Sequence, residues 1–461
     1  MSERAAARAC ARFAGTLLLA IVGCAAAESP TDQRRTRQLE DLAFARTAYV
    51  GASKAFTASD RAAALKLIGK LERHAGSLSD EEFLAGVIRI AALAHNAHDS
   101  FDAGDGAWLP PKRAPFRMLW FPDALVIART GPGFADLRGA RVLTIEGRTP
   151  EDLLARLTVL SGGIEGYRRW NVGWFIENGL LRAIGLAKSS EQLRMELLLA
   201  DGSRVNRTVE FVPRASMPHG THPPRLWSAA PYDSEVEHEW RAATDPARDP
   251  LYLQEPDQLY RMTRINPIDA LYVQLRTNDD ATHAIKDFVA DVEKRVESEH
   301  SANLVLDLRF DVGGNCDYTR ELMRWLAAHV SGRIFVLTGP YTFSAGIVNA
   351  AAIKHDGGDR VTLVGDLVGD SLRWWSEGRP QCMPNSKLCL RPTTGVWDLV
   401  KGCAGEPACY GDQYDLNVGK LDPDLAAPLK SGDWLAGRDP GVEAIMAEFT
   451  RTWAAKGKVV H

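Results

Sequence analysis

The second half of the chain alternates short apolar runs with longer segments in which apolar residues recur every three or four positions. The first pattern predicts buried strands and the second predicts amphipathic helices. Strands are expected at 271–275, 303–309, 333–338 and 360–365, and helices at 281–298, 317–329 and 345–354. This alternation is typical of a layered α/β domain with largely parallel pairing. We expect the domain to span 259–452.

The first part of the chain has a helical pattern over residues 28–115. Ser79 and Glu82 have the spacing of a capping box, and the segment that follows carries its apolar residues on one face. His95 and His98 come next, and they share a face if the helix continues that far.

Between these regions, residues 116–215 alternate short apolar runs with turns. Strands are expected at 116–121, 125–129, 141–145 and 193–199, with a helix at 151–160 that Thr149 caps and Pro150 begins. This small β-rich unit with one or two helices suits a PDZ-like module, which takes an extended peptide as an added strand. The alternative is a unit that only packs on the α/β domain. Residues 216–258 show no periodicity and predict an exposed linker or a covering loop.

Length, composition and charge indicate an ordinary globular protein of several domains. A chain of 461 residues suggests roughly two to four domains. Hydrophobic residues make up 45% and charged residues 25%, which is ordinary for a globular protein. The formal net charge is −4 and no basic stripe is present, which argues against nucleic acid as a partner.

The N-terminus carries an export signal. Several arginines precede a short apolar run at 14–22, which is too short for a membrane-spanning helix. The residues IVGC at 21–24 fit a bacterial lipobox, so residues 1–23 are expected to be a signal peptide and Cys24 the lipidated mature N-terminus. Cleavage near Ala27 is the alternative. Either interpretation places the protein in the bacterial periplasm or cell envelope. The only membrane contact expected is the lipid anchor of the lipoprotein interpretation.

The cysteines agree with export. Cys382, Cys389, Cys403 and Cys409 lie close together in a stretch rich in glycine, proline and polar residues. In an oxidising compartment they predict two disulfides, although the spacing does not determine the pairing. A four-cysteine zinc site is the alternative, but its spacings are poor. Cys316 is left over, and we interpret it as a small packed residue near the glycine turn.

Candidate chemistry lies where two of the expected strands end. The strand at 303–309 leads to a turn with Gly313 and Gly314, and the strand at 333–338 leads to Ser344 and then a helix of small residues. Acyl transfer needs a nucleophile and N–H donors aimed at the oxyanion. Ser344 is the candidate nucleophile, and the two glycines are candidate oxyanion donors. An ordinary N-cap serine and a plain turn are the alternatives.

Five segments carry a resemblance to a known family. DLRFDVGGN at 307–315 resembles a DLRxNxGG turn, TFSAG at 342–346 resembles a nucleophile segment, and GRDPGVEAI at 437–445 is similar to a closing GRDPxLEAA stretch. AHNAHDS at 94–100 is similar to a GDGHT-type turn, and residues 137–157 look like a PDZ-like module. Together they resemble the S41 or tail-specific serine peptidases, which include tricorn-core-like and interphotoreceptor-retinoid-binding-protein-like members.

The resemblance implies a mixed α/β fold, with a ClpP/crotonase-like catalytic domain beside helical and PDZ-like regions. It assigns the general base to His98, with His95 as a competing choice. One branch of the family uses a lysine after the nucleophile helix, but the equivalent segment here, around Asp370, contains none. A Ser–His arrangement is therefore preferred, with Asp370 or Glu377 as the group that orients the histidine.

One segment departs from the family's pattern. Many members continue the nucleophile as Ser-Ala-Ser-Glu, whereas Ser344 and Ala345 are followed here by Gly346 and Ile347. The expected function is an exported serine peptidase that acts on polypeptides without a metal or organic cofactor. The alternatives are an inactive S41-fold peptide-binding or scaffold protein, and a hydrolase of small esters.

Four further residues have structural interpretations. Asp307 and Arg309 are expected to form a salt bridge that holds the glycine turn. Trp374 and its neighbour could line an apolar substrate groove or belong to the core, and the sequence does not separate the two.

Overall fold

The computed structural model describes residues 29–103, 108–218, 223–281, 283–299, 302–410 and 416–457. The predicted signal peptide at 1–23 and the predicted lipidation site Cys24 lie outside the described residues. Among the helices that are described, none has both the length and the apolar character needed to cross a bilayer.

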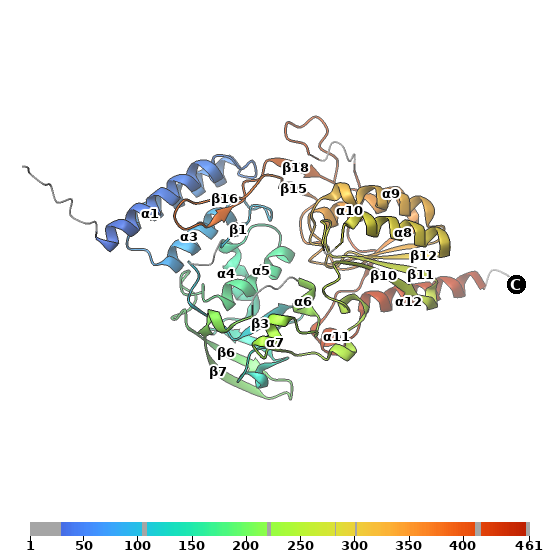
Figure 1. Ribbon diagram of the computed structural model, residues 1–461, viewed down its shortest axis with the longest axis horizontal. Coiled ribbons are helices and arrows are strands. Elements are labelled where there is room, and N and C mark those ends of the chain that lie inside the picture. The colour runs from blue at the N-terminus through green and yellow to red at the C-terminus, as the bar shows by residue number, and fades with distance from the viewer. Residues whose placement is uncertain are drawn as a thin grey trace, which may run out of the picture.

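The N-terminal region is helical, as expected (Figure 1). Its helices are α1 (Pro30–Phe44), α2 (Ala58–His74) and α3 (Asp80–Ala92), with a π-helical turn at Ala45–Val50 after α1. The predicted capping box is confirmed, because Glu82 N donates to Ser79 Oγ at 3.2 Å and Ser79 N donates to the Glu82 carboxylate at 2.9 Å. α3 ends before His95, which has a positive φ of 52°. The prediction that His95 and His98 share a helix face is therefore wrong.

The β-rich unit is an antiparallel sheet in chain order, covered by helices α4 (Pro150–Leu157) and α5 (Glu165–Glu177). Its strands are β3 (Phe116–Trp120), β4 (Leu125–Thr130), β5 (Arg141–Ile145), β6 (Gln192–Leu198) and β7 (Arg204–Glu210). The first four lie where the sequence predicted strands. Thr149 caps α4 with Pro150 in its first turn, also as predicted. The sheet shares one hydrophobic core with the N-terminal helices.

The segment expected to be an exposed linker or a covering loop packs against this sheet. It contains α6 (Pro223–Trp227), α7 (Asp233–Glu237) and β9 (Arg241–Ala242), which pairs with β4. Trp227 and Trp240 are buried, and a fully buried ion pair joins Arg129 of β4 to Glu235 of α7. The segment is therefore packed structure rather than an exposed linker.

The α/β domain holds a six-stranded sheet in the order β10-β11-β12-β13-β14-β19, in which only the β10–β11 pair is antiparallel. The strands are β10 (Tyr260–Ile265), β11 (Ala270–Leu275), β12 (Asn303–Asp307), β13 (Ile334–Thr338), β14 (Val361–Gly365) and β19 (Leu425–Ala426). Helices α8 (Ile285–Glu299), α9 (Arg320–His329) and α10 (Ala345–Gly357) cover one face, and α12 (Pro440–Gly457) covers the other (Figure 1). Burial on both faces explains the continuous apolar runs of these strands.

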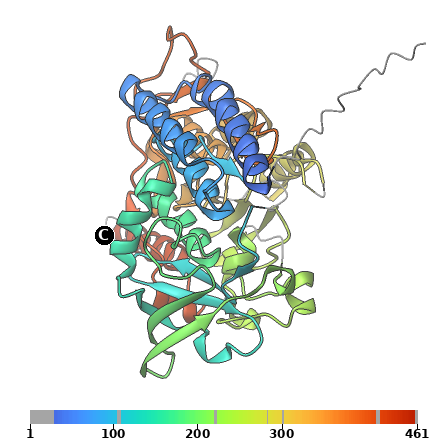
Figure 2. The same ribbon diagram turned by 90° about the vertical axis from the view of Figure 1, so that its left-hand side faces the viewer.

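A β-structured arm connects the α/β domain with the N-terminal helices, above the gap between the two units in Figure 1. It begins with β15 (Arg373–Ser376) paired to β18 (Gly395–Asp398) and continues into β16 (Gln381–Cys382) and β17 (Cys389–Leu390). β17 pairs with β1 (Phe101–Asp102), which follows the N-terminal helices in the chain. The view in Figure 2 shows the same N-terminal helices packed beside the orange arm.

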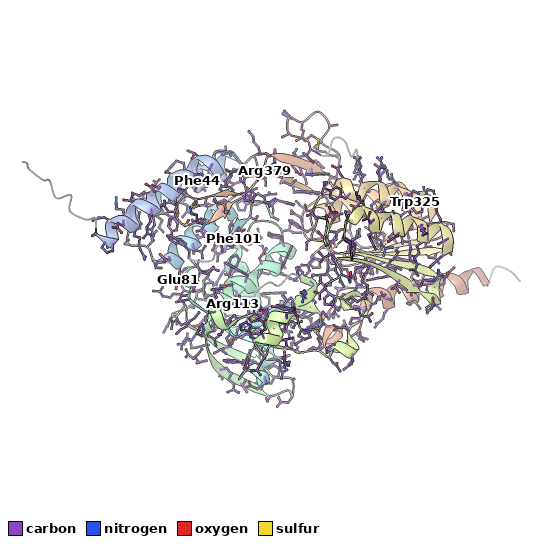
Figure 3. The ribbon with its side chains drawn as sticks, in the orientation of Figure 1. Phe44, Glu81, Phe101, Arg113, Trp325 and Arg379 are labelled. Carbon is purple, nitrogen blue, oxygen red and sulfur yellow. A yellow bond between two sulfur atoms is a disulfide. The ribbon has the colours of Figure 1, made fainter. Side chains whose placement is uncertain are left out.

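The arm also contains the cysteine-rich stretch. Cys382 is bonded to Cys389 and Cys403 to Cys409, so the prediction of two disulfides is confirmed and the zinc alternative is wrong. Cys316 is buried and belongs to neither disulfide, as expected of a packed residue. In Figure 3, Arg379 of the arm and Phe101 of β1 are labelled near the middle of the view, to the left of Trp325 of α9.

Candidate active site

Three of the predicted site residues follow the carboxyl ends of three adjacent parallel strands. Gly313 lies in the turn after β12, Ser344 in the turn after β13, and Asp370 in the loop after β14. Because parallel strands present their carboxyl ends at one edge of a sheet, these loops converge there. This edge is where ligands bind in α/β sheets in general.

Hydrogen bonds lock the three loops to one another. The Thr342 hydroxyl donates to the Leu308 carbonyl at 2.7 Å, and the Thr342 carbonyl accepts from Gly369 N at 2.8 Å. Phe343 N donates to the Asp311 carbonyl at 2.9 Å. The segment before Ser344 is thus bonded on one side to the glycine turn and on the other to the loop with Asp370.

Ser344 has a strained backbone. It begins α10 with φ 54° and ψ −122°, and its side chain makes no capping hydrogen bond. A positive φ is costly for a residue with a Cβ and persists only where the surroundings enforce it. A sharp strand-to-helix turn is also the setting that exposes the nucleophile in α/β-hydrolases. The N-cap alternative therefore loses its support.

Glycine is required at two positions around this turn. A Cβ at Gly313, whose φ is 99°, would lie 2.7 Å from the Ser344 Cβ. A Cβ at Gly346 would collide with the Asp311 carbonyl oxygen. No side chain fits at Gly346, which explains why the second serine of a Ser-Ala-Ser-Glu segment is absent here.

The amide donors near Ser344 differ in their availability. Gly313 N donates to the Asp311 carboxylate at 3.1 Å, so this amide is already engaged. The amides of Gly314 and Ala345 have no hydrogen-bond partner among the described residues. Sequence reasoning missed Ala345, although the first N–H of a helix is one that the helix cannot satisfy internally. That position directly after the candidate nucleophile was the available signal.

His98 reaches this edge of the sheet from the N-terminal unit. It lies in the loop after α3, and its ring stacks on that of Phe343, the residue before Ser344, with 4.4 Å between ring centroids. On a parallel plane, Trp374 lies 6.2 Å from the same ring and is buried, which assigns this tryptophan to the core. Neither ring nitrogen of His98 forms a hydrogen bond with a described residue.

Asp370 is the acid that faces His98. Its Oδ2 lies 3.5 Å from His98 Nδ1, and the two side chains are only 3% and 10% exposed. Glu377, the other candidate for the acid, and His95, the other candidate for the base, contact other residues. Glu377 accepts from Trp397 Nε1 at 3.2 Å, and the His95 side chain is 61% exposed beside Asp60.

The loop that carries His98 is anchored by its neighbour Asp99. Asp99 is buried and accepts four side-chain hydrogen bonds, from Tyr49, Ser53, Asn96 and Thr393. Burial raises the pKa of Asp99, although the four donors counter it. These bonds join the π-helical turn and the residues after it, the His98 loop and the arm. Sequence reasoning missed this anchor, because its partners are far apart in the chain.

Arg309 ties the glycine turn to the C-terminal motif. Its guanidinium donates to Asp307 at 2.6 Å and to Asp439 at 2.7 Å, which confirms the predicted Asp307–Arg309 salt bridge and adds a second partner. Burial opposes ionisation of Asp307, but the charge and hydrogen bonds of Arg309 outweigh it and hold the pKa of Asp307 below its ordinary value. The motif segments at 307–315 and 437–445 are thus in direct contact.

The described residues include no group of three or more His, Cys, Asp or Glu side chains arranged to hold a metal ion. The groups that do converge are a serine, a histidine paired with an acid, and two amides without partners. This set of groups can carry out acyl transfer: a hydroxyl can attack, an imidazole can move the proton, and the amides can receive an oxyanion.

Comparisons with known proteins agree with this fold. No family model matches the chain, and neither does any curated protein. Mature CPAF in complex with lactacystin is similar over 92% of this chain and 99% of its own, with a TM-score of 0.59 and 11% identity. A CPAF mutant gives the same TM-score at 12% identity, over 90% of this chain and 96% of its own. The photosystem II D1 C-terminal processing protease is more distant, with a TM-score of 0.38 and 13% identity over 90% of this chain and 96% of its own.

The likeness to CPAF shows an S41 peptidase-like fold over nearly the whole chain. The resemblance found in the sequence is therefore confirmed at the level of the fold. An identity of 11–12% shows a shared fold alone, so the chemistry has to be argued from the residues of this chain.

Proposed function

We propose that this protein is an exported serine peptidase that cleaves polypeptides through an acyl-enzyme on Ser344. The observation that carries the proposal is the strained turn at Ser344, with amides without partners beside it and a buried His98–Asp370 pair stacked against it. In this arrangement His98 is the general base and Asp370 orients it.

In the proposed reaction, Ser344 Oγ attacks the carbonyl carbon of the peptide bond while His98 takes the hydroxyl proton. The carbonyl oxygen becomes an oxyanion that Gly314 N–H and Ala345 N–H bind. Collapse of the intermediate breaks the C–N bond, and His98 returns the proton to the leaving amine. Water, activated by His98, then hydrolyses the ester and frees Ser344.

Two observations support the wider setting of this proposal. The two disulfides support export, since disulfides persist in oxidising compartments. The S41 peptidase-like fold supports a polypeptide substrate. A PDZ-like role for residues 116–215 stays a prediction, in which the substrate would add a strand to the sheet.

The test is reaction of the mature protein with a fluorophosphonate probe, followed by mapping of the labelled peptide. We expect labelling at Ser344 that is lost in Ser344→Ala and strongly reduced in His98→Ala. Ser371→Ala is the matched control, because the hydroxyl of this exposed serine donates to the Arg373 carbonyl, and the substitution keeps the backbone N–H that donates to Asp370. Lactacystin, which is bound to CPAF in its structure, serves as a second probe that should compete for the same site.

One observation favours a second candidate, a peptide-binding protein without catalysis. The ring nitrogens of His98 form no hydrogen bond within the described chain, so proton transfer from Ser344 requires a movement on substrate binding. Correctly folded protein that is not labelled but binds peptides would establish this candidate. Hydrolysis of small esters without cleavage of peptides would instead indicate an esterase.

A further inference from the structure

A buried carboxyl group lies directly beneath the glycine turn. Asp311 is fully buried, and it stands where the DLRxNxGG pattern has an asparagine. Its carbonyl oxygen accepts from Phe343 N, so its backbone is bonded to the segment that precedes Ser344. Asp311 therefore joins the two turns from which the nucleophile and the oxyanion donors come.

The Asp311 side chain is surrounded by hydrogen-bond donors. Gly313 N donates to Oδ1 and Asn349 Nδ2 of α10 donates to Oδ2, each at 3.1 Å. The donors and acceptors around Asn278 fix the orientation of its amide, in which its nitrogen donates to both Asp311 oxygens at 2.6 and 3.0 Å. Both oxygens accept only from neutral groups, and no basic side chain of the described chain forms an ion pair with Asp311.

Opposing effects act on the ionisation of Asp311 in this environment. Burial raises the pKa of Asp311 to about 7, against the hydrogen bonds from Gly313 and Asn349. The charged group that faces it is Asp279, whose carboxylate raises the pKa further. Asp279 also lies against Gly314 and accepts from Asn315 N at 2.9 Å.

We propose that ionisation of Asp311 controls the shape of the oxyanion turn, so that the site is competent only while Asp311 is a carboxylate. A carboxylate can accept from all the surrounding donors. A protonated carboxyl group carries a donor of its own and has to give up at least one of them. The inference rests on the proposed function and adds a form of regulation to the same site, in which acid switches the site off.

The hydrogen bond from the Gly313 amide to Asp311 is the one that protonation of Asp311 affects most. Gly313 and Gly314 have φ values of 99° and 134°, conformations that other residues rarely adopt and that the surrounding bonds maintain. The Asp311–Gly313 bond turns the Gly313 amide toward Asp311 and leaves the Gly314 amide available. When Asp311 is protonated, the glycine turn loses this restraint. The Gly314 amide, the proposed oxyanion donor, then no longer points toward the oxyanion.

The first experiment compares the pH dependence of fluorophosphonate labelling at Ser344 in the full mature chain and in Asp311→Asn. An imidazole base imposes an acid limb in both proteins. In the wild type two deprotonations are required, so the rate should fall about a hundredfold per pH unit at the acid end. The variant carries an amide donor where the protonated acid has its own, so its labelling should be slower at every pH and fall only about tenfold per pH unit. Parallel profiles in the two proteins would overturn the proposal.

Asp279→Asn is the matched variant, since it removes the facing charge but keeps an acceptor for Asn315 N. It should move the additional acid limb to lower pH without removing it. If the additional acid limb does not move in Asp279→Asn but is absent in Asp311→Asn, burial alone raises the pKa of Asp311. The proposed control by Asp311 would then still stand.

A second measurement does not depend on activity. In protein labelled with 15N-glycine, one glycine amide resonance should shift with pH near neutrality in the wild type and stay constant in Asp311→Asn. Absence of such a resonance would overturn the proposal even if Ser344 is labelled. If Ser344 is not labelled at any pH, the proposed function fails, and a titrating glycine amide would still show that Asp311 controls the turn.

Discussion

His98 Nδ1 and Asp370 Oδ2 face each other across 3.5 Å, and neither atom has a hydrogen-bond partner among the described residues. One residue comes from the N-terminal unit and the other from the loop after β14. A carboxylate at Nδ1 favours the tautomer that has its proton there and leaves Nε2 free to act as a base. The contact between the two units therefore completes the proposed catalytic group.

The first prediction concerns this pair. Asp370→Asn should lower the rate of fluorophosphonate labelling at Ser344 by about 10⁴-fold, the loss that a serine protease shows when the acid of its triad becomes an amide. Glu377→Gln is the matched control, because this carboxylate lies in the neighbouring arm and bonds to Trp397 instead of His98. Equal rates in wild type and Asp370→Asn would contradict the assigned role.

The second prediction concerns the anchor of the His98 loop. Asp99→Ala leaves four buried donors without their acceptor and should cost about 3 kcal/mol of unfolding free energy, measured by urea denaturation. Labelling at Ser344 should fall toward the level of His98→Ala, because the loop loses its position. Tyr49→Phe and Ser53→Ala remove one donor each and should cost only about 1 kcal/mol. Full labelling in folded Asp99→Ala would show that this anchor does not position His98.

The strand ends of the site could be predicted from sequence because each rests on a local signal. An apolar run followed by Gly313 and Gly314, or by Ser344 and a run of small residues, marks a buried strand that ends in a tight turn. Parallel pairing then places these turns at one edge. Asp370 had no such local signal and was proposed from the family resemblance, at the position where the lysine of the other branch is absent.

The surroundings of His98 could not be predicted in this way. Helical spacing continues past Ala92, yet Asn96 bonds the backbone of Trp375 in the arm, at 2.7 Å through its amide nitrogen. Such contacts between distant segments override local helix propensity, and one sequence does not show them. Asp311 was visible only as one letter of a motif, because its burial and its ring of donors exist only in the folded chain.

The third prediction concerns Arg309. Arg309→Leu leaves the fully buried carboxylate of Asp307 without its cation and should cost about 3–5 kcal/mol at neutral pH. Since Arg309 holds the pKa of Asp307 below its ordinary value, the pair stabilises the protein above pH 4 and loses this contribution as pH falls through the folded-state pKa. The difference in unfolding free energy between the wild type and the variant should therefore become smaller in acid. A constant difference from pH 7 to pH 3 would contradict this explanation.

The fourth prediction takes the opposite sign for Asp311. Its pKa is raised from 3.8 to about 7, so the folded state holds a proton that the unfolded state has lost between these values. Stability relative to Asp311→Asn should fall by about 1.4 kcal/mol per pH unit across this window, or about 4 kcal/mol in total. Urea denaturation of both proteins from pH 4 to pH 8 measures it. A difference that does not change with pH would show that Asp311 stays ionised throughout.

The last prediction separates the two disulfides. Each closes a short loop, so replacing either pair by serines should cost about 2 kcal/mol of unfolding free energy. Only the Cys382–Cys389 pair lies in the strands that bond to β1, where Cys389 faces Asp102, four residues after His98. Cys382→Ser/Cys389→Ser should therefore also slow labelling at Ser344, whereas Cys403→Ser/Cys409→Ser should not. Equal labelling by the two folded variants would show that the arm holds His98 in place without its disulfide, through the bond from Arg391 N to the Ser100 carbonyl at 3.0 Å and the contacts of Asp99.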